Sequence, residues 1–99
     1  MSYPPALSDI LASETSIEFW ELMKNRMVTS YYKYGNGRNH SPGERTSIRN
    51  AEIRISKYEE TGNTEWLVDA ANFLMIEFMF PQHPNAHFRA TDSNESPGI

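Results

Sequence analysis

The sequence has 99 residues, of which 38% are apolar and 12% aromatic, and this predicts one domain with enough apolar material for a small core. A formal net charge of -4 excludes a broad attraction to nucleic acid, and the absence of cysteine excludes disulfides and thiolate chemistry. No signal peptide is visible, and the longest apolar run is too short to span a bilayer, so we expect a cytoplasmic protein without a membrane partner.

The first 14 residues are expected to form an N-terminal arm. Tyr3 precedes two prolines, which predicts an extended entry because proline disfavours a helical conformation in the residue before it. One or two helical turns follow over residues 6–12, and their apolar side is formed by Leu7, Ile10 and Leu11.

The first main helix is predicted to begin after a capping box, with Thr15 as the N-cap and Glu18 three residues later, and to stop at Gly35. Apolar residues in this segment recur at steps of three, four and seven, which is the period of one helix face. We therefore expect a buried face made of Ile17, Trp20, Met27, Tyr31 and Tyr34, and widened by Phe19, Leu22 and Met23.

The next helix is predicted to follow a glycine-rich loop over residues 35–43, with Ser41 as its cap and Pro42 at its first position. Gly62 ends it, and Asn63 or Thr64 caps the helix that comes after. The three- and four-residue steps predict a buried face of Ile48, Ala51, Ile55 and Tyr58.

The last helix, over residues 65–80, is apolar on almost every side and stops at Pro81. A helix of this kind belongs in the middle of a protein or an oligomer, so we expect at least a homodimer with this helix in the interface. Residues 81–99 are polar and rich in turns, which predicts an irregular strap held by Phe88. The predicted fold class is all-α: a small bundle of three main helices over residues 15–80, between the arm and the strap.

One narrow polar stripe runs along this apolar helix. Glu65, Asp69 and Asn72 fall within roughly 60° of one another on the helix wheel. An unpaired buried carboxylate is costly, so the stripe should face a metal, a cation, water or a ligand. The alternative to a ligand is an arginine partner for Asp69, such as Arg49.

Carboxylates on two helices suggest a magnesium site. Carboxylates on facing helices are the usual metal ligands of α-helical bundles, and Mg²⁺ prefers oxygen ligands that it shares with phosphates. The candidate catalytic and metal-binding residues are therefore Glu18, Glu21, Glu65 and Asp69. The alternative is that the two glutamates of the first main helix belong to a solvated face.

The end of the first main helix and the loop after it could bind a nucleotide. Tyrosines offer stacking planes, and Lys33 and Arg38 offer phosphate contacts. The alternative is an ordinary helix end, where the tyrosines pack on the core and Lys33 complements the helix dipole. The candidate ligand-binding residues, including two from the later helices, are Tyr31, Lys33, Tyr34, Arg38, Arg49 and Asn72.

Three segments together resemble small phage and actinobacterial proteins related to the MazG-like all-α NTP pyrophosphatases. They are Lys33-Tyr34-Gly35, the stretch from Lys57 to Thr64 (KYEETGNT), and the stretch from Glu65 to Phe73 (EWLVDAANF). The resemblance implies an oligomer that cleaves nucleoside triphosphates with Mg²⁺. It also implies that Glu18 and Glu21 correspond to the Glu-x-x-Glu pair of the family.

The sequence departs from the family pattern at the later acidic pair, because Glu65 and Asp69 are four residues apart where the family usually has three. Three functions stay open: hydrolysis of a nucleotide, non-catalytic sequestration of a signalling nucleotide by a phage protein that counters host defence, and a protein-interaction or inhibitor module. The first two predict a ligand that contacts Asp69. The third predicts that an arginine pairs with Asp69 and covers it.

Overall fold

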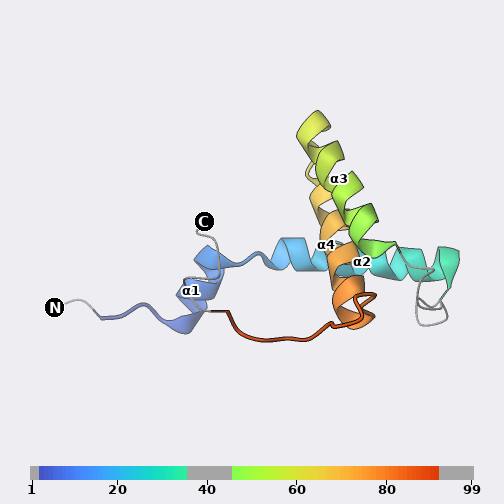
Figure 1. Cartoon of the computed structure of the whole chain (residues 1–99). Helices are drawn as coiled ribbons and strands as arrows, with labels where there is room; N and C mark the ends of the chain where they lie inside the picture. Colours follow the sequence, from blue (N-terminus) through green and yellow to red (C-terminus); the bar gives the residue numbers. More distant parts are fainter. Residues whose placement is uncertain (1–2, 36–45, 92–99) are drawn as a thin grey trace.

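The computed structural model describes residues 3–35 and 46–91 of the chain. In these residues it contains helices and no strand, which confirms the all-α class: α1 (Leu7–Glu14), α2 (Ile17–Tyr34), α3 (Ser47–Thr61) and α4 (Glu65–Met79). Figure 1 shows α3 and α4 side by side as an antiparallel hairpin, with α2 crossing them and α1 standing apart. Among the described helices, none is both long enough and apolar enough to cross a membrane.

Glycines end two of the helices where the sequence predicts. Gly35 has φ 80° and its N–H donates to the carbonyl of Tyr31 at 2.9 Å, which closes α2. Gly62 has φ 73° and its N–H donates to the carbonyl of Tyr58 at 2.7 Å, which closes α3. Positive φ costs glycine little because it has no Cβ. The last helix, α4, ends at Met79, two residues before Pro81.

One helix start differs from the prediction. Ser16, not Thr15, caps α2, because the Ser16 hydroxyl accepts the N–H of Phe19 at 3.0 Å. Thr15 instead ends α1, where its N–H donates to the carbonyl of Leu11 at 3.0 Å. In the described part, α3 begins at Ser47 after Thr46, and the predicted cap residues Ser41 and Pro42 lie outside the described residues. The start of α4 is as expected.

The core of the described chain is small. Its buried side chains belong to α2, α3 and α4 and are mostly small: Met23, Ser47, Ala51, Val68, Ala70 and Asn72. The predicted buried face of α3 is wrong at Ile48 and Ile55, which are both exposed. Small residues let α3 and α4 approach closely, so the larger isoleucines lie outside the contact.

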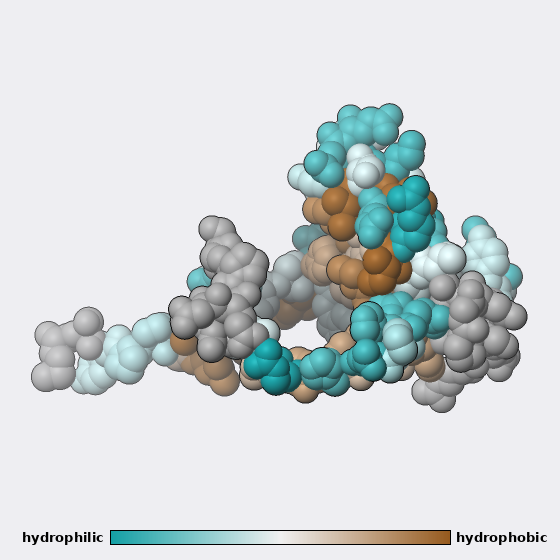
Figure 2. Space-filling model, viewed as in Figure 1, coloured by the Kyte–Doolittle hydropathy of each residue, from teal (hydrophilic) through white to brown (hydrophobic). Residues whose placement is uncertain are grey.

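Several large apolar side chains are exposed on this chain (Figure 2). The predicted buried face of α2 is right at Met23, which is buried against α4, and in part at Phe19 and Met27, which are half-buried. It is wrong for the exposed residues Ile17, Trp20, Leu22, Tyr31 and Tyr34. On the described part of the strap, Phe88 is also exposed, so it does not dock on its own chain.

Candidate functional site

The polar stripe of α4 meets α2 of the same chain. Arg26 donates to both carboxylate oxygens of Asp69, from Nε to Oδ1 at 3.1 Å and from Nη2 to Oδ2 at 3.3 Å. Its Nη1 lies 3.4 Å from Oε1 of Glu65. The hydrogen bond and the charge of Asp69 raise the pKa of Arg26. Next to this cluster, Asn72 donates from Nδ2 to the carbonyl of Met23 at 3.1 Å.

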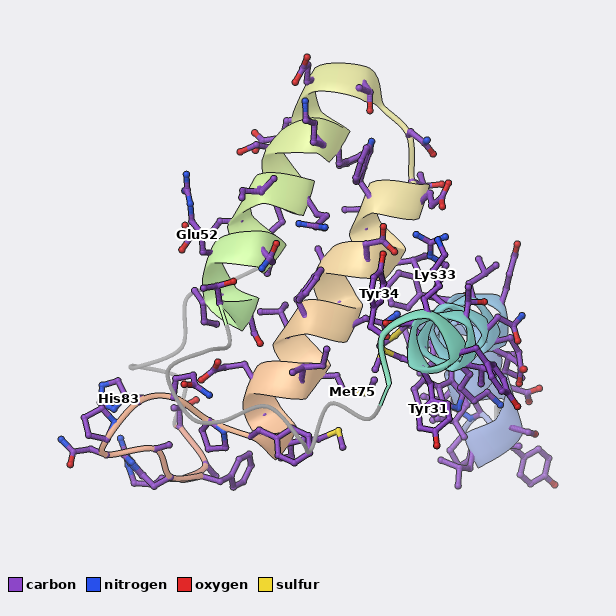
Figure 3. All side chains as sticks on the ribbon, turned by 90° about the vertical axis from the view of Figure 1, so that its right-hand side faces the viewer. Tyr31, Lys33, Tyr34, Glu52, Met75 and His83 are labelled. Atoms are coloured by element: carbon purple, nitrogen blue, oxygen red, sulfur yellow. The ribbon has the colours of Figure 1, made fainter. Side chains whose placement is uncertain are left out.

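The arginine partner of Asp69 is Arg26 and not Arg49, so the prediction that Arg49 pairs with Asp69 is wrong. Arg49 pairs with Glu52 on its own helix at 3.7 Å. Figure 3 shows Glu52 on the side of α3 that faces away from α2. The sequence held a signal for Arg26, because it lies three residues after Met23 and so shares the helix face that packs on α4.

The four predicted catalytic carboxylates do not form one cluster. Glu18 and Glu21 lie exposed on α2, and Glu21 pairs with Lys24 at 2.8 Å. The residues that the structure describes contain no group of three or more metal-ligating side chains. A guanidinium between Glu65 and Asp69 repels a divalent cation, so these donors do not fit Mg²⁺ as arranged. Magnesium binding stays a prediction, and no chemical step is derived through it.

A pocket of about 240 Å³ lies between α2, α3 and α4. Four residues predicted from the sequence line it, namely Lys33, Tyr34, Asp69 and Asn72. In Figure 3, Lys33 and Tyr34 lie above α2, while Tyr31 lies below it. The structure thus brings together part of the predicted site. Two cations that the sequence analysis did not assign to a site, Arg26 and Arg54, complete the charged lining.

Two polar atoms in the pocket lining are buried and have no hydrogen-bond partner among the described residues. They are Nε of Arg54 and Oδ1 of Asn72. Arg54 is held in place, because Nη1 donates to Oδ1 of Asn50 at 2.7 Å and its guanidinium lies 4.6 Å from the ring centre of Phe73. An unpartnered buried polar group costs about 1–3 kcal/mol. Both atoms are shielded from solvent, so a ligand in the pocket would reach them only after a local rearrangement of the lining.

The other predicted ligand-binding residues are not in this pocket. Tyr31 and Arg49 are exposed and do not line it. Arg38 lies outside the described residues. The tyrosine pair at residues 31 and 32 makes an edge contact instead, with ring centres 5.7 Å apart.

Comparison with protein-family models, with curated proteins and with solved structures gave no match. The resemblance to the MazG-like pyrophosphatases stays a prediction.

Proposed function

We propose that the chain binds a nucleotide in this pocket and holds it without hydrolysing it. The observation that carries the proposal is that two cations, Lys33 and Arg54, and the ring of Tyr34 line one pocket. A phosphate oxygen accepts from a guanidinium or ammonium N–H, and a base stacks on an aromatic ring. A nucleotide carries both kinds of group.

The charge of the lining favours an anion. Arg26, Lys33 and Arg54 carry three positive charges against the single carboxylate of Asp69, which leaves an excess of two. Arg26 is already bound to Asp69, so Lys33 and Arg54 are the cations available to a phosphate. Tyr34 is exposed at the rim and offers a plane on which a base can stack.

Capture is favoured over hydrolysis because Arg26 forms ion pairs with the carboxylates of Glu65 and Asp69. In the magnesium interpretation these two carboxylates would hold the ion that binds the phosphates. Their pairing within the chain leaves a pocket with phosphate-binding groups and without a described acidic cluster. Holding a nucleotide without turnover is what sequestration of a signalling nucleotide requires.

The experiment is a thermal-shift screen of linear and cyclic nucleotides, with and without Mg²⁺, because a ligand that binds only the folded state raises the Tm. The test variant is Arg54→Gln, and the matched control is Arg49→Gln, which removes the same charge from the same helix at a side chain that is 72% exposed. We expect a rise in Tm for the wild type and the control and none for the test variant.

Two results would contradict the proposal: no nucleotide raises the Tm, or both variants lose the shift equally. Chromatography of the incubated nucleotide separates capture from hydrolysis. Release of monophosphate and pyrophosphate that depends on Mg²⁺ would replace capture with the pyrophosphohydrolase function.

A second candidate function, the protein-interaction module, is favoured by a different observation. An arginine, Arg26, pairs with Asp69, as a protein-interaction module predicts, and apolar side chains of α2 are exposed. This function predicts no shift with any nucleotide, whereas substitutions on the exposed side of α2 would abolish assembly. The nucleotide screen of the wild type and the assembly of α2 variants therefore separate the two functions.

A further inference from the structure

Arg26 binds two acidic side chains of α4 at once. Its Nε and Nη2 donate to the two carboxylate oxygens of Asp69, and its Nη1 lies 3.4 Å from Oε1 of Glu65. One guanidinium thus contacts two carboxylates that lie about one helical turn apart. The hydrogen bond to Asp69 and the charge of that carboxylate raise the pKa of Arg26, so the guanidinium stays positively charged in this place.

Asp69 is the carboxylate of this pair that affects the pocket between α2, α3 and α4. Its side chain lines the pocket and is 16% exposed, whereas that of Glu65 does not line it and is 57% exposed. Water therefore screens the charge of Glu65 more than that of Asp69. Without Arg26, an uncompensated negative charge would face a pocket whose cations, Lys33 and Arg54, suit an anion.

Arg26 and Lys33 lie on the same side of α2. They are two helical turns apart, and Thr29 and Ser30 between them also line the pocket. Two turns span about 10 Å of helix, so the charge of Asp69 lies on the order of 10 Å from a phosphate held by Lys33. At an effective dielectric constant of about 20 and low salt, one charge at this distance changes a binding constant roughly tenfold.

We propose that Arg26 neutralises Asp69 and so supplies the positive charge that a divalent cation would otherwise supply, which lets the pocket bind a phosphate group without Mg²⁺. This role rests on the proposed binding of a nucleotide phosphate in the same pocket, and it explains why the two carboxylates do not repel that phosphate. Arg26 acts through Asp69, to which it is hydrogen-bonded, and does not contact the phosphate. Lys33 and Arg54 make that contact.

A set of variants relates the charge of the lining to its affinity for phosphate. The wild-type lining has an excess of two positive charges, Arg26→Gln reduces the excess to one, and Arg26→Gln with Asp69→Asn returns it to two. We expect Arg26→Gln to weaken phosphate binding about tenfold and the double variant to bind as the wild type does. The matched control is Arg26→Gln with Glu65→Gln, which should stay weak because Glu65 does not line the pocket.

The probe is inorganic phosphate, added to the full chain at low ionic strength and compared with chloride at equal ionic strength. The chemical shifts of the Lys33 amide and of the Arg54 Nε–H report binding at the pocket itself. Adding Mg²⁺ should leave the wild-type dissociation constant unchanged. The Tm of each sample separates charge from packing, because the double variant lacks the ion pair and should stay less stable than the wild type while it regains affinity.

Four results would overturn the role of Arg26: no binding of phosphate to the wild type, wild-type binding that Mg²⁺ strengthens, native affinity in Arg26→Gln, or a double variant with Asp69→Asn that stays weak. The last result would mean that Arg26 contacts the phosphate directly. If phosphate follows the expected order and no nucleotide raises the Tm, the proposed nucleotide function fails and the role of Arg26 stands. If a nucleotide binds and the variants break the order, the reverse holds.

Discussion

The contact between Arg26 and Asp69 gives the sharpest test of how α2 is held on the hairpin. Replacing Asp69 with asparagine is nearly isosteric and keeps one oxygen to accept from Nε, but it removes the charge. If the carboxylate serves this contact, the variant should fold, lose stability and still bind nucleotide, at least as tightly as the wild type because the pocket lining loses its negative charge. If the carboxylate is a metal ligand, the same variant should keep its stability and lose Mg²⁺-dependent binding.

The size of the loss follows from the geometry and the exposure of the two side chains. Exposed ion pairs contribute about 0.2–1 kcal/mol, and hydrogen bonds to charged groups about 1.5–3 kcal/mol. This pair is bidentate, with Asp69 16% exposed and Arg26 49% exposed, so solvent screens the arginine side. We expect Asp69→Asn to lower the free energy of unfolding by about 1 kcal/mol, which lowers the Tm by about 4–8 °C in a domain of this size.

A double-mutant cycle isolates the pair from other effects of each change. Urea unfolding of Arg26→Gln, Asp69→Asn and the double variant should give a coupling energy of about 1 kcal/mol. The control cycle uses Arg49→Gln and Glu52→Gln, an exposed pair at 3.7 Å, and should give about 0.3 kcal/mol or less. Equal coupling in the two cycles would refute the view that this contact holds α2.

The pH dependence of this pair follows from the direction in which the pKa of Arg26 is shifted. The pKa of Arg26 is raised by Asp69, so the stabilisation is fully present below the ordinary arginine pKa and is lost only above the raised one. From neutral pH to about pH 10 the contribution of Arg26 should stay constant. Molar salt should reduce the coupling, because half of the guanidinium is exposed.

Three further predictions test single features. Gly62→Ala should cost about 1 kcal/mol in urea unfolding, because φ is 73° and no atom lies within 4 Å of the added Cβ, so the cost is that of the backbone alone. Ser16→Ala should destabilise the chain by about 1 kcal/mol, and an equal loss in Thr15→Ala would contradict the cap assignment. Lys33→Gln should weaken nucleotide binding about tenfold by calorimetry at unchanged Tm, whereas Lys57→Gln, outside the pocket, should bind as the wild type does.

The helix ends were predictable because they depend on local chemistry. Gly35, Gly62 and Pro81 act on their own backbone, and their effect does not depend on what the helix later contacts. The side of α2 that is buried depends on which helix lies across it, and periodicity alone does not contain that information. Of the apolar residues predicted to be buried on α2, the structure buries Met23 and leaves Ile17 and Tyr31 exposed.

The sequence could predict what kind of partner the candidate site needs, but not which residue supplies it. The stripe of Glu65, Asp69 and Asn72 correctly implied a cation or a ligand as its partner. Arg26 and Arg49 were equally available from composition, and only the crossing of α2 over α4 selects Arg26. The unpartnered Nε of Arg54 depends on three helices meeting, so no pattern within one helix could reveal it.

The arrangement of the hairpin and α2 has a consequence for how the chain folds. The turn between α3 and α4 needs only residues 62–64, so this hairpin closes a short loop and forms first. The last contacts to form are those of α2, namely the Arg26 cluster and the bond from Asn72 to Met23. Native-state hydrogen exchange should then show α2 opening as a unit of low stability while the amides of α3 and α4 stay protected.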